Sequence, residues 1–246
     1  MKIAVFSDIH GNKEALEAVI SSIKKKKVDR TICLGDTIAI GPDSNDCLNI
    51  IRKNKIRMTI GNHEKYFLKG IPYSETDRPE EYNHQKWVKT TISAKNKKYL
   101  ENCPYGIKLT EAGKEFLFIH YKMEYDRFKN EVRKPNDPSK TKEFENKIKE
   151  LFRESQFAIF GHDHHEYQVD KENSFYLNVG SSGCTEDDNT HYYILNINDK
   201  DISSERINEK YNRNKFLERM KQIDYPAKEF IKKTFYGIGK SIIKNK

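Results

Sequence analysis

The stretch that decides the fold is residues 3–12, IAVFSDIHGN, in which a short apolar run gives way to a polar segment. Directly downstream, apolar residues recur at helical spacing, at Ala15, Leu16, Val19, Ile20 and Ile23. The sequence therefore predicts a strand, a loop and a helix in that order.

The same order returns twice further along the chain. Residues 30–34 form a second apolar run, followed by a loop at 35–42 and a helical pattern at 47–51. A third apolar run at 56–60 ends just before the polar residues 61–64. Such repeats imply right-handed parallel crossovers, which gather the functional loops at the carboxyl ends of the strands. We expect an α/β fold.

The rest of the chain is more varied, and its second half looks more antiparallel. Between residues 71 and 138 we expect a turn-rich loop at 71–78, a helix at 81–100, a strand at 116–119 and an irregular loop at 121–138 that is suited to covering a site. A helix at about 142–152 should follow, and then strands at 157–160, 166–169, 175–179 and 192–197. From residue 201 we expect a strand and two short helices, which are separated at 224–226. We find no internal repeat and no linker.

Composition bounds the class of protein. Of 246 residues, 36% are hydrophobic and 33% charged, which excludes a disordered or fibrous chain. No apolar segment is long enough to span a bilayer, and the amino-terminal run is too short for a signal peptide. The four cysteines lack paired spacing, which agrees with a reducing compartment. We expect a cytoplasmic protein that does not bind membranes.

The net charge of +8 raises the question of a nucleic-acid partner. Lysine is abundant throughout the chain, however, and the run at 24–27 ends a helix whose other face is apolar. We therefore do not expect a nucleic-acid partner.

The basic tail at 228–246 carries Phe230, Ile231, Phe235 and Ile238 at helical spacing, which favours a helix packed on the core over a membrane anchor. We expect a core over residues 1–200, with an insertion at about 70–105, and an extension at 201–246 packed on it.

Polar side chains that can bind metals follow the predicted strands. Five of the eight histidines do so, as do two aspartates and an asparagine: His10, His63, His120, His162, His164, Asp8, Asp36 and Asn62. Because strand residues alternate between faces, the Asp8 and His10 side chains can bind one ion. The mixture of imidazole, carboxylate and amide suits manganese, iron or zinc better than calcium. Asp36 is the candidate carboxylate to bridge two ions.

The motifs together resemble the calcineurin-like metallophosphoesterase superfamily. They are, in order, Asp8-Ile9-His10, Gly35-Asp36, Gly61-Asn62-His63-Glu64, His120 and Gly161-His162-Asp163-His164. Residues 7–12 and 35–42 further resemble the small bacterial branch that holds phosphodiesterases and diadenosine-tetraphosphate hydrolases, and so does the segment from 84–87 to 103–104.

The resemblance implies a four-layer αββα sandwich with mixed sheets and a metal-dependent hydrolase. Asp8, His10 and His164 would hold one divalent ion, and Asn62, His120 and His162 a second, with Asp36 bridging them. Manganese or iron is expected first, with zinc, nickel and cobalt as further candidates. A hydroxide between the ions would attack phosphorus.

Three further residues receive roles from the same resemblance. His63 would orient the phosphate or protonate the leaving oxygen, or else hydrogen-bond to a ligand. Asn12 would hold either the phosphate or the first loop. Tyr121 stands where glycine is frequent, and it offers either an aromatic surface to the substrate or a packing contact.

The second motif helps to choose the substrate class. Protein Ser/Thr phosphatases of the superfamily continue it with an aspartate and an arginine, but Ala39 and Ile40 stand at those positions. We therefore expect hydrolysis of phosphodiesters or nucleotide phosphoanhydrides in a small phosphorylated or nucleotide substrate. A protein or small-molecule phosphomonoesterase is the alternative, and a nuclease or a non-catalytic scaffold is less favoured. The physiological substrate, the metal and the oligomeric state stay open.

Overall fold

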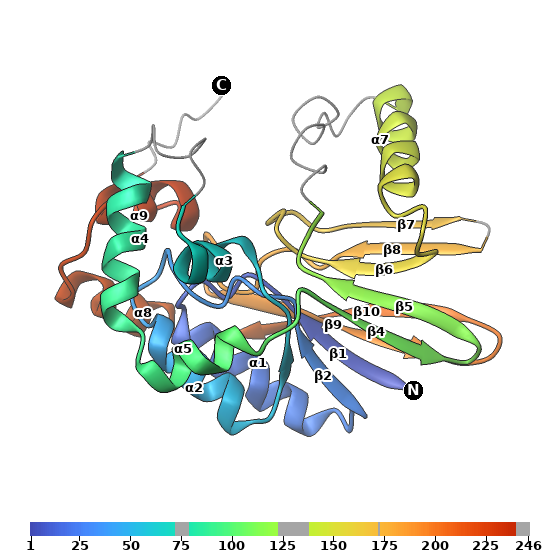
Figure 1. Cartoon of the computed structure of the whole chain (residues 1–246), viewed down its shortest axis with the longest axis horizontal. Helices are drawn as coiled ribbons and strands as arrows, with labels where there is room; N and C mark the ends of the chain where they lie inside the picture. The colour runs from blue at the N-terminus through green and yellow to red at the C-terminus, as the bar shows by residue number, and fades with distance from the viewer. Residues whose placement is uncertain (72–78, 123–137, 172, 240–246) are drawn as a thin grey trace.

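Two five-stranded sheets face each other and form the centre of the molecule (Figure 1). The computed structural model describes residues 1–71, 79–122, 138–171 and 173–239. The strand order is β10-β9-β1-β2-β3 in the first sheet and β4-β5-β6-β8-β7 in the second.

The first sheet contains the strands that the opening motif predicts. Its members are β1 (Lys2–Phe6), β2 (Arg30–Cys33), β3 (Arg57–Met58), β9 (Asn189–Ile197) and β10 (Ile202–Lys210). Strands β1, β2 and β3 are parallel, whereas β9 and β10 are antiparallel to their neighbours.

The second sheet is also mixed. Its members are β4 (Gly106–Glu111), β5 (Lys114–Ile119), β6 (Phe157–Phe160), β7 (Tyr167–Lys171) and β8 (Ser174–Asn178). Strands β5, β6 and β8 are parallel, and β4 and β7 run antiparallel at the two edges. The second half is more antiparallel than the first, as expected, in the pairing of β4, β7, β9 and β10, whereas β5, β6 and β8 at the centre of this sheet are parallel.

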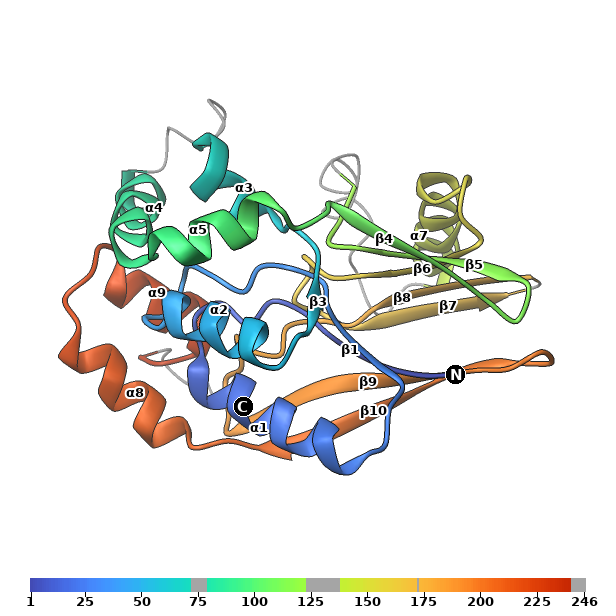
Figure 2. The same ribbon diagram turned by 60° about the horizontal axis from the view of Figure 1, so that its bottom comes forward.

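Helices cover the outer faces of both sheets (Figures 1 and 2). Helices α1 (Lys13–Lys25), α2 (Ser44–Lys53) and α5 (Ala94–Glu101) lie on the side of the first sheet, and α7 (Pro138–Leu151) lies against the second. Helices α3 (Asn62–Lys69), α4 (Pro79–Thr91), α8 (Arg213–Gln222) and α9 (Lys228–Tyr236) gather at one end of the molecule. The predicted four-layer α/β sandwich is confirmed.

Alternation along the strands creates the layers. Ile3 and Val5 pack between the two sheets, whereas Ala4 and Phe6 face the helices of the first sheet. In the same way, Phe157 and Ile159 point between the sheets, and Phe160 points toward α7. Because strand side chains alternate with a period of two, each central strand contributes to two apolar layers.

Three elements differ from the sequence prediction. The helix expected at 81–100 is two helices, because the Ser93 Oγ accepts a hydrogen bond from Asn96 N at 3.3 Å and starts α5. Strand β4 and helix α3 were not predicted. Residues 72–78 and 123–137 of the two expected loops lie outside the described part of the chain.

The carboxyl-terminal segment adds one strand and two helices to the sandwich. Strand β10 pairs with β9 along its whole length. Helices α8 and α9 share an apolar cluster that includes Phe216, Met220 and Tyr236, and this cluster also contains Ala15 and Ile40. No helix within the described ranges combines the length and apolar character needed to cross a membrane.

Candidate metal centre

Loops at the carboxyl ends of β1, β2 and β6 turn sharply where the candidate ligands lie. Asp8, His10, Asp36 and His162 all have positive φ, between 47° and 70°. A side chain in this left-handed region costs about 1 kcal/mol or more per residue. The surrounding structure compensates for this cost and directs the side chains of both sheets toward one place.

A first group of donors consists of Asp8, His10 and His164. The Asp8 Oδ1 lies 3.5 Å from the Nε2 atoms of both histidines. The two Nε2 atoms lie 3.1 Å apart. All three donor atoms therefore converge, as sequence analysis predicted.

The hydrogen bonds of this group show which of its atoms could bind a cation. The Nδ1 of His10 lies 3.2 Å from the Ile38 carbonyl oxygen, which can only accept a hydrogen bond, so Nδ1 carries the proton. In the neutral ring the Nε2 lone pair then faces the Asp8 carboxylate. Asp8 Oδ1 is buried and has no hydrogen-bond partner among the described residues. Because a buried carboxylate oxygen without a partner is costly, these residues fit a bound metal ion.

A second group consists of Asn62, His120 and His162. The Asn62 Oδ1 lies 3.1 Å from His120 Nε2 and 2.9 Å from His162 Nδ1. His120 Nδ1 donates to the Leu34 carbonyl oxygen at 2.9 Å, which turns Nε2 toward the site. These side chains also lie together as predicted.

The Asp36 carboxylate lies between the two groups. Its Oδ2 is 3.1 Å from His120 Nε2 and 3.8 Å from His10 Nε2, and its Oδ1 accepts a hydrogen bond from His63 N at 2.9 Å. One carboxylate thus faces donors of both groups.

The electrostatics of the site favour cations beside its carboxylates. Burial alone would raise the pKa of Asp36. The charge and the hydrogen bond of His120, together with the other histidines near Asp36, outweigh burial and hold the pKa of Asp36 below its usual range. Conversely, burial alone would lower the pKa of His120, whereas Asp36 and Asp8 raise it to about 9. Two buried carboxylates therefore require positive charge, and divalent ions would supply it.

Glu64 holds the loops in place, a role that sequence analysis missed. Its two carboxylate oxygens accept hydrogen bonds from the backbone N–H groups of four residues: Asp36, Thr37, Ile38 and Gly61, at 2.8 to 3.2 Å. A Cβ at Gly61 would lie 2.2 Å from Asp36 Oδ1, so only glycine fits there. The motif at residues 61–64 thus supplies a close approach, a candidate ligand and a clamp for the second loop.

His63 lies beside the two groups, and one of its ring nitrogens forms a further possible metal-binding cluster with donor atoms of His10 and Asp36, all within 4.8 Å of one another. Its ring is 5.1 Å from that of His10, and Gln85 Nε2 donates to its Nδ1 at 2.5 Å. Burial lowers the pKa of His63 to about 3, and the neighbouring histidines act in the same direction. The ring is therefore neutral at pH 7 and carries its proton on Nε2. Gln85 was not predicted, since nothing in its spacing marks it.

The two residues expected at the substrate have different surroundings. The Asn12 side chain is buried, its Oδ1 accepts from Ala15 N at 3.1 Å, and its Nδ2 donates to the Gly183 carbonyl oxygen at 2.8 Å. These bonds hold the first loop and begin α1, so a substrate contact by Asn12 is not supported. Tyr121 stacks on His162, with ring centroids 4.1 Å apart.

Cys184 is a further candidate donor that the sequence did not indicate. Its sulfur and one ring nitrogen each of His10 and His164 lie within 4.8 Å of one another. Its Sγ also contacts the Tyr236 hydroxyl of α9 at 4.0 Å. The carboxyl-terminal segment thus reaches the edge of the first group.

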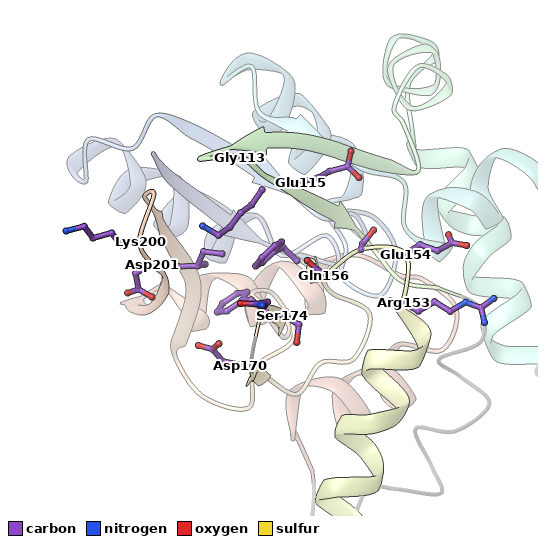
Figure 3. A pocket seen from close by; sticks show the side chains of 15 residues that line it. Gly113, Glu115, Arg153, Glu154, Gln156, Asp170, Ser174, Lys200 and Asp201 are labelled. Atoms are coloured by element: carbon purple, nitrogen blue, oxygen red, sulfur yellow. The ribbon is translucent and has the colours of Figure 1, made fainter.

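A hollow of about 710 Å³ lies away from these donors, at the edge of the second sheet near the amino ends of β5, β6 and β8 (Figure 3). The charged side chains of Glu115, Arg153, Glu154 and Lys200 are spread around it rather than converging. Within the described residues, the groups able to hold a metal all lie at the other edge.

The fold places clustered candidate metal ligands at one edge of the two sheets, and comparison with known proteins identifies the family. The calcineurin-like phosphoesterase superfamily domain matches residues 1–200. The chain therefore belongs to the calcineurin-like phosphoesterase superfamily, as its motifs predicted.

The individual proteins that the chain resembles share little sequence identity with it. An uncharacterized protein of Methanocaldococcus jannaschii is 26% identical over 236 residues, covering 89% of this chain and 91% of its own. A metallophosphoesterase from Sphaerobacter thermophilus has a similar fold, with a TM-score of 0.67 and 19% identity over 94% of this chain and 97% of its own. A hypothetical protein from Pyrococcus horikoshii gives a TM-score of 0.70 and 14% identity over 96% and 98% of the two chains.

Proposed function

We propose that this protein is a dinuclear, metal-dependent phosphoesterase that hydrolyses phosphodiesters or nucleotide phosphoanhydrides. The observation that carries this proposal is the convergence of two donor groups on either side of Asp36, with Asp8 Oδ1 buried and unpartnered among the described residues. Family membership agrees with phosphoester hydrolysis.

Seven side chains would bind the two ions. Asp8, His10 and His164 would hold one ion, and Asn62, His120 and His162 the other, while Asp36 would contact both. Manganese or iron suits this set of nitrogen and oxygen donors. When bound, two divalent ions lower the pKa of water and neutralise the charge on phosphate oxygens.

His63 would act on the substrate rather than on a metal. Because Gln85 donates to Nδ1, the proton on Nε2 is available for a hydrogen bond to a phosphate oxygen or to the leaving oxygen. His63 lines a cavity of about 550 Å³ together with His10, Asp36, Asn62, His162 and His164, so a phosphate bound beside these candidate ligands would lie in the same cavity as the His63 ring.

The first prediction tests the bridging carboxylate. Metal-free protein reloaded with manganese should hydrolyse bis(p-nitrophenyl) phosphate, and Asp36→Asn should lower kcat by about 100-fold or more, because the amide loses the charge that two ions share. Release of p-nitrophenol and the amount of bound manganese would both be measured.

The control is Asp224→Asn, at a fully exposed aspartate, which should leave activity and bound metal unchanged. Undiminished activity of the Asp36 variant would contradict the bridging role. Absence of hydrolysis by the loaded wild-type protein with every diester and anhydride tested would contradict the function itself. Faster hydrolysis of p-nitrophenyl phosphate would favour the monoesterase alternative.

A further inference from the structure

The cavity over the candidate metal centre has one wall made by the carboxyl-terminal helix. Its floor includes His10, Asp36 and His164, and α9 contributes Phe230 and Phe235 to its side. The Phe235 ring centroid lies 5.8 Å from that of His164. An aromatic surface therefore begins directly beside the donors.

Phe230 is unusually exposed for a phenylalanine. Its exposed fraction is 57%, and the other large hydrophobic side chains that are exposed among the described residues, Tyr105 and Tyr82, have smaller exposed fractions. Sequence analysis expected Phe230 to pack on the core with Ile231, but only Ile231 is buried. An exposed aromatic ring on a cavity wall is available to pack against an apolar group of a ligand.

The wall is held rigidly from behind. Ile231 and Tyr236 are buried in the apolar cluster of the carboxyl-terminal segment. Arg213 Nη2 donates to the Tyr236 carbonyl oxygen at 2.6 Å, and His84 Nδ1 donates to the Pro226 carbonyl oxygen at 3.2 Å. Because α9 is fixed at both ends, its exposed rings are positioned before any ligand arrives.

Charge on the opposite wall restricts what else can bind. Helix α4 places Glu80 and Glu81 at the cavity, and none of the described residues lining it is a lysine or arginine. The phosphate that is hydrolysed can be neutralised by the metals. Among the described lining residues, a second or third phosphate would meet the Glu80 carboxylate and no lysine or arginine, which is unfavourable.

We infer that the α9 wall binds a flat aromatic ring attached to a single phosphate, so that the substrate is a phosphodiester carrying an aryl or nucleoside group rather than a dinucleoside polyphosphate. This inference rests on the proposed function, and it selects among the substrates that the proposed function allows. Phe230 and Phe235 contact the ring, while the donor groups face the phosphate.

Two phosphonates separate the contribution of the ring from that of the phosphate. Neither phenylphosphonate nor methylphosphonate contains an ester bond, and they differ in the aromatic ring. We expect manganese-loaded, full-length protein to bind phenylphosphonate about tenfold more tightly in titration calorimetry, since part of the ring leaves water. In Phe230→Ala this preference should fall below about threefold, with methylphosphonate binding unchanged.

The matched control is Tyr105→Ala, which truncates an exposed aromatic side chain that does not line the cavity. It should keep the wild-type preference. An equal affinity of the wild-type protein for both phosphonates, or an undiminished preference in Phe230→Ala, would overturn the inference.

Turnover distinguishes the source of the ring and the number of phosphates. We expect kcat/KM for bis(p-nitrophenyl) phosphate or thymidine 5′-(p-nitrophenyl phosphate) to exceed that for diadenosine tetraphosphate by about tenfold or more, and the better of the two diesters identifies an aryl or a nucleoside ring. A higher kcat/KM for diadenosine tetraphosphate would overturn the single-phosphate assignment.

If methylphosphonate binds and diesters are hydrolysed but no ring preference exists, only this inference fails. If no phosphonate binds and no ester is hydrolysed, the proposed function fails with it.

Discussion

Gln85 links helix α4 to His63 at the candidate site. Its side chain is buried, its Nε2 donates to His63 Nδ1, and its Oε1 has no hydrogen-bond partner among the described residues. The amide therefore selects one tautomer and one ring orientation of His63. Gln85 is a positioning residue in this arrangement.

Replacing Gln85 with leucine should release His63 while preserving a side chain of similar size. We expect kcat for bis(p-nitrophenyl) phosphate to fall about tenfold, because the proton of His63 is no longer confined to Nε2. Gln85→Glu should change the pH profile of kcat, since a carboxylate beside Nδ1 stabilises the protonated ring.

Steady-state kinetics between pH 5 and 9 would measure both effects. The exposed Gln222→Leu at the end of α8 serves as the control. Equal kcat values and coincident pH profiles for wild type and both Gln85 variants would argue against this positioning role.

Among the elements, α4 ties the loop after β2 to the carboxyl-terminal segment through His84. The His84 Nε2 accepts a hydrogen bond from Ile40 N at 2.8 Å, and its Nδ1 donates to Pro226. Ile40 has a φ of 63°, which is strained for a β-branched residue. The neutral imidazole therefore stabilises a loop conformation that Ile40 would otherwise avoid.

Protonation of His84 should destabilise this arrangement, because a proton on Nε2 would face the N–H of Ile40. Burial lowers the pKa of His84 from 6.5 to about 4. The unfolded chain thus binds this proton more readily, so the contribution to stability is fully present above about pH 6.5 and is lost as the pH falls toward 4. Between pH 7.5 and pH 4.5, we expect the unfolding free energy of the metal-free wild-type protein to fall by about 2 kcal/mol more than that of metal-free His84→Gln.

Urea unfolding at the two pH values would measure this difference. His165→Gln provides the matched control, since the His165 side chain is 77% exposed. Parallel losses of stability in wild type and His84→Gln would contradict the role assigned to His84.

Some helices and strands could be predicted from the sequence pattern, and others could not. Strong apolar runs such as residues 3–6 and 157–160 predict buried central strands, because both faces are covered. Strand β4 was missed because it lies at an edge, with Lys108 exposed between the buried Ile107 and the partly buried Leu109. Helix α3 was missed because its apolar residues, Tyr66, Phe67 and Leu68, are consecutive in the sequence and show no helical spacing.

At the scale of the whole molecule, the candidate site depends on both sheets. Sequence analysis could predict that Asp8 and His164 converge, because each follows a strand whose carboxyl end reaches the same edge. It could not predict the α9 wall, because helical periodicity does not say whether an apolar face meets a core or a cavity. Gln85 and Cys184 were missed for a related reason, since only tertiary packing brings them to the site.

Removing residues 212–246 tests how far the core depends on its extension. The deletion exposes Ala15 and Ile40 and removes the buried side chains of Phe216, Met220 and Tyr236. Each such burial contributes about 1.5 to 3 kcal/mol, so the total is comparable with the stability of a whole domain. We expect the truncated chain to melt at a much lower temperature, or to lack a cooperative transition, in circular dichroism.

A deletion of residues 240–246 alone, which retains α8 and α9, should melt like the full chain. A cooperative transition at the wild-type temperature in the longer deletion would instead identify residues 1–211 as an independently stable unit.

The left-handed backbone at Asp8, His10, Asp36 and His162 limits how this fold can be made more robust. Glycine adopts positive φ without the steric conflict that a Cβ introduces. Selection for heat resistance alone would therefore favour glycine at these four positions, and each replacement would delete a candidate ligand. A thermostable descendant that keeps its chemistry would have to gain stability elsewhere, through helix caps, surface charges or shorter loops.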